Sequence, residues 1–480
     1  MSKPITRLFL VIVVLFALLV AWTSRWSVFG ADSLRDNPDN KRPLFAALRV
    51  KRGAIKADDG TVLARSVRAS GGTWSREYPT GSLFGHPVGY AKLISGQLSG
   101  LERSRNDELS GTTSELNSIL DQLQGKRRAG NTVVTTLDPT AQRVATDALQ
   151  GQKGAVVALD PRTGAVKAMA SSPGYDPNVI NSRAGLRSLN ADGADAPLLD
   201  RVTQGAYPPG STFKVVTAAA ALNSGAVSSP DAPVLNGDSP ATISGVPLRN
   251  DDRSWGPVSI TTALTFSINT AFARLGERLG KRTMADYMHR FGFYSLPPLD
   301  YPKDQMISSG ERGPDGRLIP VASPSVDVGR MAIGQDKLLV TPMQMAMVAS
   351  AVANGGKLMA PHLTDKVVDP DGRTIDTIEP KQYSQPMSAR TASELTTMMG
   401  HVVEEGTGTA VQLPGIDVAG KTGTAELSIR DHINQPWFIA FAPADNPQIA
   451  IAVTVEHSVN GFGGAVAAPI ARQVLLSLLR

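Results

Sequence analysis

The pattern of apolar and polar residues first sets apart an apolar segment near the N-terminus from the rest of the chain. Residues 8–22 form an unbroken apolar run, and Lys3 and Arg7 precede it. The run is short for a membrane-spanning helix and long for the apolar core of a signal peptide, so length alone fits both. The positive charges favour a cytoplasmic N-terminus with the bulk of the chain outside. Residues 28–30 make only a fair cleavage site, so the pattern favours an uncleaved anchor.

A small domain with weak patterning follows the apolar run. Residues 36–43 are polar and contain proline, which predicts a linker. Residues 54–57 and 61–64 alternate around the turn 58–60 and predict a β-hairpin. The rest is rich in glycine, serine and charge, with a short amphipathic helix predicted at 113–123. We expect a small, irregular, mainly β pedestal that carries no catalytic residue.

From residue 137 onward the pattern is strong enough to define a large domain. Its predicted elements are a helix opened by Asp138 and Pro139 and ending at Leu149, a hairpin of strands 155–159 and 165–170, strands 418–425, 437–442 and 449–455, and a closing helix 469–479. The simplest arrangement is one antiparallel sheet built from both ends of the domain with a helical insert between them, an α+β fold. The predicted segments are a cytoplasmic tail (1–7), a transmembrane signal anchor (8–29), the pedestal (30–135) and the large domain (136–480).

The insert begins with a loop and a helix that place a serine and a lysine together. Residues 207–210 contain two prolines and a glycine, and the alanine-rich segment 215–222 with Gly225 behind it predicts a helix. Ser211 then lies at or next to a helix N-terminus, and Lys214 lies one turn further on the same face. A neutral lysine can take the proton of a serine hydroxyl and make it nucleophilic. Taken alone, the pair is weak evidence and favours a serine helix cap beside a solvated lysine.

A second motif lies on the first of the late strands. Lys421-Thr422-Gly423 is the only K-[ST]-G in the chain, as Ser211 and Lys214 form its only S-x-x-K. Lys421 supplies a cation that would keep a neighbouring lysine neutral and attract an anionic substrate. Thr422 and Thr424 offer hydroxyls to a carboxylate, and Gly423 lets a ligand backbone lie close. The alternative is a surface lysine on a weak strand with a glycine bulge.

A third motif lies between these two. S-x-N occurs four times, and only Ser267-Ile268-Asn269 falls between the two unique motifs. It is part of a predicted helix at 261–279 with small residues around the polar pair. The alternative is a hydroxyl and an amide that cap helix turns.

Composition removes several classes of function. The net charge of +5 has no basic run behind it, so nucleic-acid binding is not indicated. The absence of cysteine excludes thiol catalysis, disulfides and cysteine-bound metals. Six histidines form no H-E-x-x-H pair and no serine lies in G-x-S-x-G, so metalloprotease and α/β-hydrolase patterns are missing. We expect neither a metal nor a cofactor.

The order S-x-x-K, S-x-N and K-T-G resembles the superfamily of penicillin-binding proteins and serine β-lactamases. Further motifs resemble the class B proteins: Arg52-Gly53-Ala54-Ile55 with Asp59-Gly60, Gly100-Leu101-Glu102, Asp160-Pro161 with Thr163-Gly164, Ala168-Met169-Ala170, Tyr207 to Gly210, Gly334-Gln335 with Thr341-Pro342, and Gly406 to Ala410. They span residues 52 to about 455. The short pedestal is similar to the division-associated type A of actinobacteria. The resemblance implies a transpeptidase domain whose antiparallel sheet has helices on both faces and an inserted helical subdomain.

The resemblance also implies a role for each motif in D,D-transpeptidation of peptidoglycan stem peptides. Ser211 would attack the carbonyl between two terminal D-alanines, with Lys214 as general base. The backbone N–H groups of Ser211 and Thr424 would form the oxyanion hole. Ser267, assisted by Lys421, would pass a proton to the leaving amine.

The remaining implied roles concern binding. Asn269 would hold the amide of the donor peptide, Thr422 and Thr424 its terminal carboxylate, and Gly423 would give it room. An amine of a neighbouring stem peptide would then attack the acyl-enzyme, and a β-lactam would acylate Ser211 without easy release. The implied partners are stem peptides on lipid-linked precursors, β-lactams, the cytoplasmic membrane and, for a division enzyme, a glycosyltransferase and division proteins.

Two rival functions use the same motifs. A β-lactamase is disfavoured because an anchor and a pedestal suit a wall-building enzyme better than a scavenger. A β-lactam sensor or a structural division scaffold that keeps the fold is the non-enzymatic alternative. Three intact motifs argue against a silent scaffold.

Overall fold

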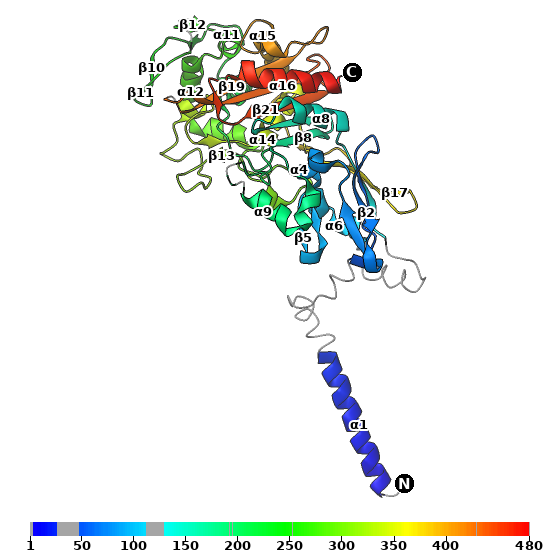
Figure 1. Cartoon of the computed structure of the whole chain (residues 1–480). Helices are drawn as coiled ribbons and strands as arrows, with labels where there is room; N and C mark the ends of the chain where they lie inside the picture. Colours follow the sequence, from blue (N-terminus) through cyan, green and yellow to red (C-terminus); the bar gives the residue numbers. More distant parts are fainter. Residues whose placement is uncertain are drawn as a thin grey trace.

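The computed structural model describes residues 3–25, 48–111 and 129–479, except residues 192, 194, 252 and 429. The predicted linker and the predicted helix at 113–123 lie outside the described residues. Helix α1, Lys3–Ser24, has 22 residues and a mean hydropathy of 2.7, and none of its residues is buried. It is drawn in blue, apart from the folded body, in Figure 1. Length and composition would allow α1 to cross a membrane.

The pedestal contains a six-stranded sheet in the order β17-β16-β6-β1-β2-β3. Its strands are β1 Ile55–Lys56, β2 Val62–Arg68, β3 Trp74–Glu77, β6 Thr132–Thr135, β16 Thr364–Val368 and β17 Thr374–Thr377. Strands β1 and β2 pair antiparallel and confirm the predicted hairpin. Strands β16 and β17 come from late in the sequence, and β16 pairs with β6. The larger domain therefore contributes two strands to the pedestal sheet, beside the blue strands of Figure 1.

The pedestal motifs noted in the sequence meet in a buried ion cluster. Glu102, which is fully buried, binds the guanidinium of Arg52 at 2.6 Å and that of Arg76 at 2.5 Å. The two arginines hold the pKa of Glu102 below its usual range although burial alone would raise it. Removing either arginine would leave a buried carboxylate poorly compensated, so these motifs have a structural role.

The larger domain contains a second antiparallel sheet in the order β19-β20-β21-β7-β8. Its strands are β7 Gly154–Leu159, β8 Val166–Ser172, β19 Ala419–Ser428, β20 Ile433–Ala442 and β21 Ile449–Val455, with β22 Ser458–Val459 beside β20. Strand β7 pairs with β21, so both ends of the domain meet in one sheet, as the sequence predicted.

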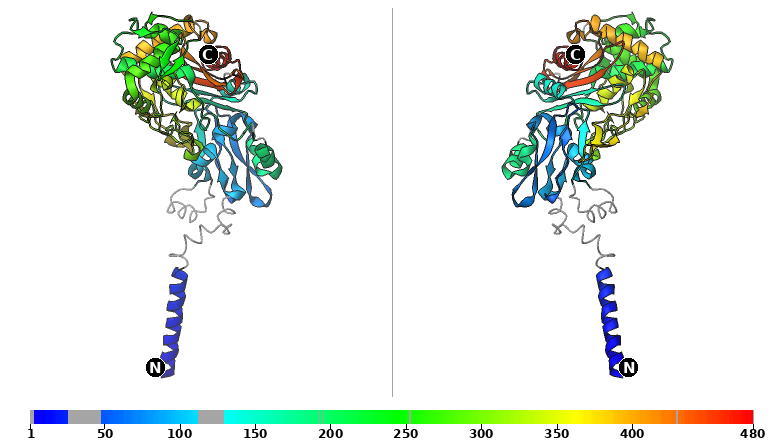
Figure 2. Two further views of the ribbon diagram at one scale, coloured as in Figure 1. Left: turned by 90° about the vertical axis from the view of Figure 1, so that its left-hand side faces the viewer. Right: turned by 90° about the vertical axis from the view of Figure 1, so that its right-hand side faces the viewer.

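Helices cover both faces of this sheet. Alternate residues divide between two cores, since Val157 and Ile439 face one and Val156 and Ala440 face the other. Helices α8 Pro139–Ala148 and α16 Gly463–Leu478 pack on one face. Helices α10 Lys214–Asn223 and α14 Pro342–Ala353 belong to the other core. Figure 2 shows the red C-terminal helix on one side of the sheet and the green and yellow insert on the other.

The structure differs from two predicted helices. The closing helix starts at Gly463 and not at Pro469, because Ala467 and Ala468 already bury their side chains against the sheet. The predicted helix 261–279 is wrong as a single element. It is two helices, α11 Ile260–Thr265 and α12 Asn269–Arg290, separated at Ser267.

The remaining elements are short or lie in the insert and the pedestal. The helices are α4 Gly85–Val88, α5 Gly100–Ser104, α6 Asn106–Ser110, α9 Arg183–Ala191, α13 Val328–Met331 and α15 Ala389–Glu404. The strands are β4 Ala91–Lys92, β5 Gln97–Leu98, β9 Leu235–Asn236, β10 Ala241–Ile243, β11 Val246–Leu248, β12 Pro257–Val258, β13 Gly310–Glu311, β14 Leu338–Leu339, β15 Leu358–Met359 and β18 Gln382–Ser384. The 3-10 turns are η2 Ser70–Gly72, η3 Gly81–Phe84, η4 Leu93–Ser95, η5 Pro177–Asn181, η6 Gly210–Phe213, η7 Lys303–Gln305 and η8 Thr409–Val411.

Candidate active site

Backbone contacts fix the loop that carries Ser211. Gly210 has a φ of 53°, and its N–H donates to the carbonyl of Gly334 at 2.9 Å. A Cβ on Gly210 would lie 2.7 Å from the carbonyl oxygen of Thr424 on β19. The positive φ and the close approach both require glycine here. Because Ser211 follows Gly210 directly, the serine lies beside the K-T-G strand.

Ser211 does not cap the following helix. It lies in the 3-10 turn η6, and α10 begins only at Lys214, with Phe213 as a cap residue that makes no side-chain bond. The alternative of a helix-capping serine is therefore wrong. The side chain of Ser211 is partly exposed, as access to a substrate requires.

Lys214 joins the first motif to the S-x-N motif. The residue is fully buried. Its Nζ donates to the carbonyl of Ser267 at 2.6 Å and to Oδ1 of Asn269 at 2.7 Å, and lies 3.2 Å from Oγ of Ser267. None of these bonds involves Ser211. The alternative of a solvated lysine is wrong, and S-x-N is more than a pair of helix caps.

The break between α11 and α12 positions the S-x-N motif. Ser267 has a φ of 57°, an uncommon conformation for a residue with a side chain. The turn lets the carbonyl and the hydroxyl of Ser267 reach the same amine, and it starts α12 at Asn269. A continuous helix would have used the Ser267 carbonyl in its own bonding. Backbone strain of this kind concentrates at functional sites.

The K-T-G strand adds a second buried lysine. Lys421 is fully buried, so it is not the surface residue of the alternative interpretation. Its Nζ donates to the carbonyl of Thr422 at 3.2 Å and to the Thr422 hydroxyl at 3.3 Å. That hydroxyl also lies 2.6 Å from the hydroxyl of Thr407. The Thr424 hydroxyl accepts the N–H of Gly463 at 3.2 Å.

Gly423 is required for the contact between this strand and the loop that carries Ser211, residues 207–213, called the nucleophile loop for its proposed role. A Cβ at Gly423 would lie 2.7 Å from the carbonyl oxygen of Pro209 and 2.9 Å from a side-chain carbon of Thr212. Any larger residue would push β19 away from η6. The glycine predicted to make room for a ligand thus also makes room for the loop.

Burial lowers the pKa of both lysines, and the charge of Lys421 lowers that of Lys214 further. Burial, and then the charge of Lys421, hold the pKa of Lys214 well below its usual range, while Asp251 opposes the shift. Burial lowers the pKa of Lys421 to about 7, again against Asp251. The site therefore supports a neutral Lys214 at neutral pH.

Sequence reasoning missed Asp251 as part of the site. Its carboxylate accepts a hydrogen bond from Nδ2 of Asn269 at 3.5 Å. Its negative charge raises the pKa of both lysines and so opposes the effect of burial. Asp251 lies in an irregular loop outside the three motifs, so nothing in the sequence indicated that it would belong to the site. Thr407 and Gly334 belong to motifs that the sequence did single out, but their contacts depend on the folded sheet.

Protein-family models match both parts of the chain. The model described as the penicillin binding protein transpeptidase domain matches residues 154–476, and the penicillin binding protein A dimerisation domain matches residues 52–133. The peptidoglycan D,D-transpeptidase PbpA of Mycolicibacterium smegmatis is 36% identical over 508 residues, covering 100% of this chain and 99% of that protein. PbpA of Mycobacterium tuberculosis is 34% identical over 506 residues with the same coverage.

Solved structures agree with the sequence relatives. The ceftriaxone acyl-enzyme of penicillin-binding protein A from M. tuberculosis superimposes with a TM-score of 0.80 at 34% identity, covering 91% of this chain and 100% of that one. The D,D-transpeptidase domain of a peptidoglycan glycosyltransferase from Eggerthella lenta gives 0.77 at 34% identity, with 90% and 98% covered. This chain belongs to the class B penicillin-binding proteins, the serine-type peptidoglycan D,D-transpeptidases, and is close to mycobacterial PbpA.

Proposed function

We propose that the chain crosslinks peptidoglycan through an acyl-enzyme on Ser211. The observation that supports this most directly is the fully buried Lys214 held between Ser267 and Asn269. A neutral amine has two N–H donors and one lone pair. The two shortest bonds of Nζ, to the Ser267 carbonyl and to Asn269 Oδ1, use both donors. The lone pair is then left to accept a hydroxyl proton.

Acylation follows from this arrangement. Ser211 Oγ attacks the carbonyl between the terminal D-alanines while its proton passes to Lys214. The tetrahedral oxyanion is stabilised by the backbone N–H groups of Ser211 and Thr424. The C–N bond then breaks, and the proton returns from Lys214 through the Ser267 hydroxyl to the departing D-alanine amine.

Transfer to the acceptor reverses the same proton path. The amine of a second stem peptide attacks the acyl carbonyl and loses its proton to Lys214, and Ser211 Oγ leaves with a proton. Asn269 binds the amide of the donor, and the Thr422 and Thr424 hydroxyls bind its carboxylate, which Lys421 attracts when charged. The M. tuberculosis relative has been solved as penicillin G, imipenem and ceftriaxone acyl-enzymes, which supports β-lactam acylation of the same serine here.

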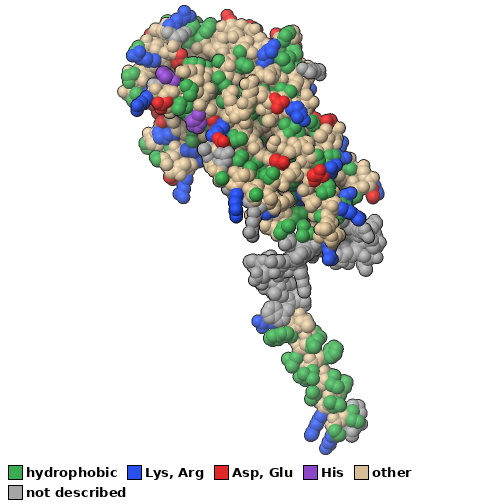
Figure 3. All heavy atoms as spheres, viewed as in Figure 1, with side chains coloured by type: hydrophobic (Ala, Val, Ile, Leu, Met, Phe, Trp, Pro, Cys, Tyr) green, Lys and Arg blue, Asp and Glu red, His purple; other side chains and the backbone are tan. Residues whose placement is uncertain are grey.

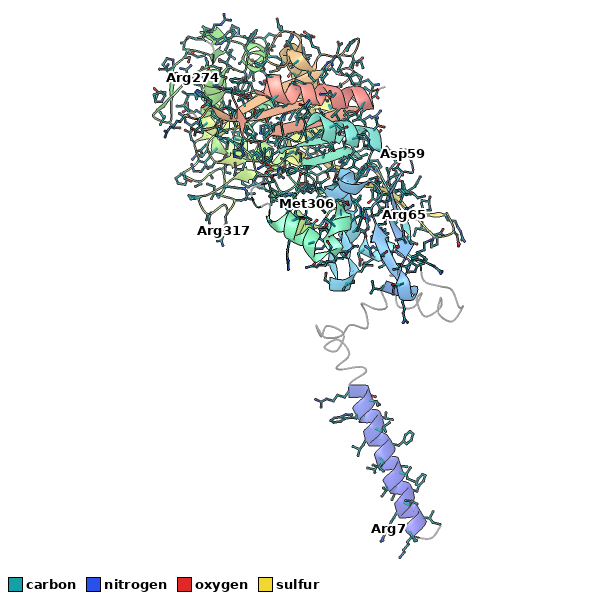
Figure 4. All side chains as sticks on the ribbon, in the orientation of Figure 1. Arg7, Asp59, Arg65, Arg274, Met306 and Arg317 are labelled. Carbon is teal, nitrogen blue, oxygen red and sulfur yellow. The ribbon has the colours of Figure 1, made fainter. Side chains whose placement is uncertain are left out.

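The location proposed for the enzyme follows from α1. Figure 3 shows apolar side chains along this helix and basic ones at both of its ends, and Figure 4 labels Arg7 near the N-terminal end. Basic residues before a span favour a cytoplasmic N-terminus. The enzyme would be a single-pass protein of the cytoplasmic membrane with both domains outside. The role proposed in septal wall synthesis, with a glycosyltransferase and division proteins, rests on the resemblance of the short pedestal to the division-associated type A.

Mass mapping of the penicillin adduct tests the chemistry. We expect a long-lived adduct on Ser211 that Ser211→Ala abolishes, and transfer of a D-alanyl-D-alanine donor to an added amine. Labelling at another residue would overturn the assignment of the nucleophile. Rapid turnover of penicillin would indicate a β-lactamase, and a stable adduct without transfer would indicate a sensor.

A further inference from the structure

A buried acid outside the active site has no partner for its carboxyl group. Glu311 lies on β13, and its side chain is 0% exposed. Neither carboxyl oxygen has a hydrogen-bond partner within the described residues. An unpaired carboxylate in such a place is costly, so the neutral acid is the form that the fold accommodates. Burial raises the pKa of Glu311 to about 8.

The charged groups around Glu311 do not neutralise it. Asp336 repels the carboxylate and raises its pKa further, while the ammonium and, more weakly, the backbone N–H of Lys337 lower it. The guanidinium of Arg312 instead donates to two backbone carbonyls, that of Ser308 at 2.6 Å and that of Gly316 at 2.7 Å. The Tyr294 hydroxyl accepts a hydrogen bond from the backbone N–H of Glu311 at 3.2 Å, and it makes none with the carboxyl group.

Glu311 is separated from the nucleophile loop by one segment of chain, residues 334–340. Strand β13 pairs with β14 in this segment, with Glu311 opposite Leu338. Val340, directly after β14, exchanges two backbone hydrogen bonds with Tyr207, at 2.8 and 3.0 Å. Tyr207 is four residues before Ser211 in the loop.

The other end of the segment is packed against the same loop. The carbonyl of Gly334 accepts the N–H of Gly210 at 2.9 Å. A Cβ on Gly334 would lie 1.9 Å from the carbonyl oxygen of Gly210, so the two backbones are in direct contact. Residues 334–340 thus hold the loop at both ends, and a shift of β14 must move the loop or break these bonds.

We propose that Glu311 is a positioning residue whose neutral carboxyl keeps residues 334–340 against the nucleophile loop, and whose ionisation withdraws that support and slows acylation. An ionised Glu311 would gain hydration only if β13 and β14 separate enough to admit water. That separation would move the segment that holds Tyr207 and Gly210. The proposal rests on Ser211 being the nucleophile.

The test measures acylation of the full-length protein in detergent by a fluorescent penicillin between pH 6 and 9.5. Varying the penicillin concentration separates non-covalent binding from the acylation rate constant. With a pKa of about 8, Glu311 is about ten-to-one ionised at pH 9, so Glu311→Gln should acylate about tenfold faster than the parent there and equally fast at pH 6. Binding before acylation should not differ. Glu379→Gln, at an exposed position, is the matched control.

Two charge variants give the proposal a directional test. Asp336→Asn removes a repelling charge, so the alkaline loss should move to lower pH. Asparagine suits the φ of 68° at this position. Lys337→Gln removes an attracting charge, so the loss should move to higher pH. Any alkaline loss due to Lys421 should be the same in all variants.

Two results would overturn the proposal. One is a Glu311→Gln profile identical to that of the parent, and the other is a shift of both charge variants in the same direction. If Glu311→Gln does not fold, the directions in which Asp336→Asn and Lys337→Gln shift the alkaline loss of acylation still test the proposal. A failure of the proposed function gives a different result, because the penicillin adduct would then lie elsewhere than on Ser211.

Discussion

Lys214 and Ser267 are joined twice, since one amine donates to the backbone carbonyl at 2.6 Å and lies 3.2 Å from the side-chain hydroxyl of the same residue. The two residues are 53 positions apart in the chain. The double contact sets the direction of the amine and, in the proposed mechanism, the path by which its proton would leave. The contact requires the positive φ at Ser267, so the position of the amine depends on this strained backbone conformation.

The first prediction separates the two lysines. Lys214→Arg places a permanent positive charge where the lysine is neutral and removes the basic form, because arginine stays protonated. We expect near-complete loss of penicillin acylation at every pH up to 9, and a lower stability because the added charge is buried beside Lys421. Lys421→Arg should lose much less, since that site needs a cation. Acylation rates of both variants against the parent are the measurement, and the reverse order would exchange the two roles.

The second prediction isolates the strain at Ser267. Ser267→Ala and Ser267→Gly both remove the hydroxyl, so both should slow transfer to the acceptor amine. Only glycine relieves the positive φ, so the glycine variant should be more stable than the alanine variant by about 1 kcal/mol. Denaturant unfolding of the two proteins measures the difference. Equal stabilities would mean that this backbone carries no strain.

The local motifs could be predicted from sequence because each is short and contiguous. The S-x-x-K and K-T-G motifs each occur once in the chain, and their order resembles a known arrangement. The break at Ser267 could not be predicted, since residues 261–279 have a good helical pattern. The helix ends there because Lys214, from a distant segment, takes the carbonyl of Ser267. Tertiary contact overrode local propensity.

Strand order shows a similar limit. The sheet built from both ends of the large domain followed from apolar strands alone. The addition of β16 and β17 to the pedestal sheet did not, since β17 is exposed along its whole length and has no apolar face. Asp251 was missed for a related reason, because only the fold brings its charge near the lysines.

The third prediction compares two glycines with nearly the same backbone. Gly334 has a φ of 78° and Gly225 a φ of 77°. A Cβ would lie 1.9 Å from a carbonyl oxygen at Gly334 and meets nothing within 4 Å at Gly225. Gly225→Ala should therefore cost about 1 kcal/mol for the backbone alone. Gly334→Ala should cost at least about 3 kcal/mol or prevent folding, and should slow acylation of any folded fraction. Similar losses of stability would refute the close contact between Gly334 and the nucleophile loop.

The last prediction concerns the pH dependence of stability. Lys421 has a pKa of about 7 in the folded protein, below the value of about 10.4 for an exposed lysine. Between these values the unfolded chain binds more protons than the folded one, so this residue makes folding more favourable as pH rises from 7 to 10. Below pH 7 the protein bears the full penalty of a buried ammonium.

Lys421→Met should relieve that penalty while filling the same space. We expect the variant to be more stable than the parent by on the order of a few kcal/mol at pH 6, with the gain shrinking towards pH 10. Its acylation should be severely impaired at all pH values, because the cation of the site is gone. Thermal unfolding of parent and variant at pH 6, 8 and 10 measures the trend. If the difference in stability between the two proteins does not change with pH, Lys421 keeps an ordinary pKa in the folded protein. Lys421 would then be fully charged at neutral pH when it repels a proton from Lys214.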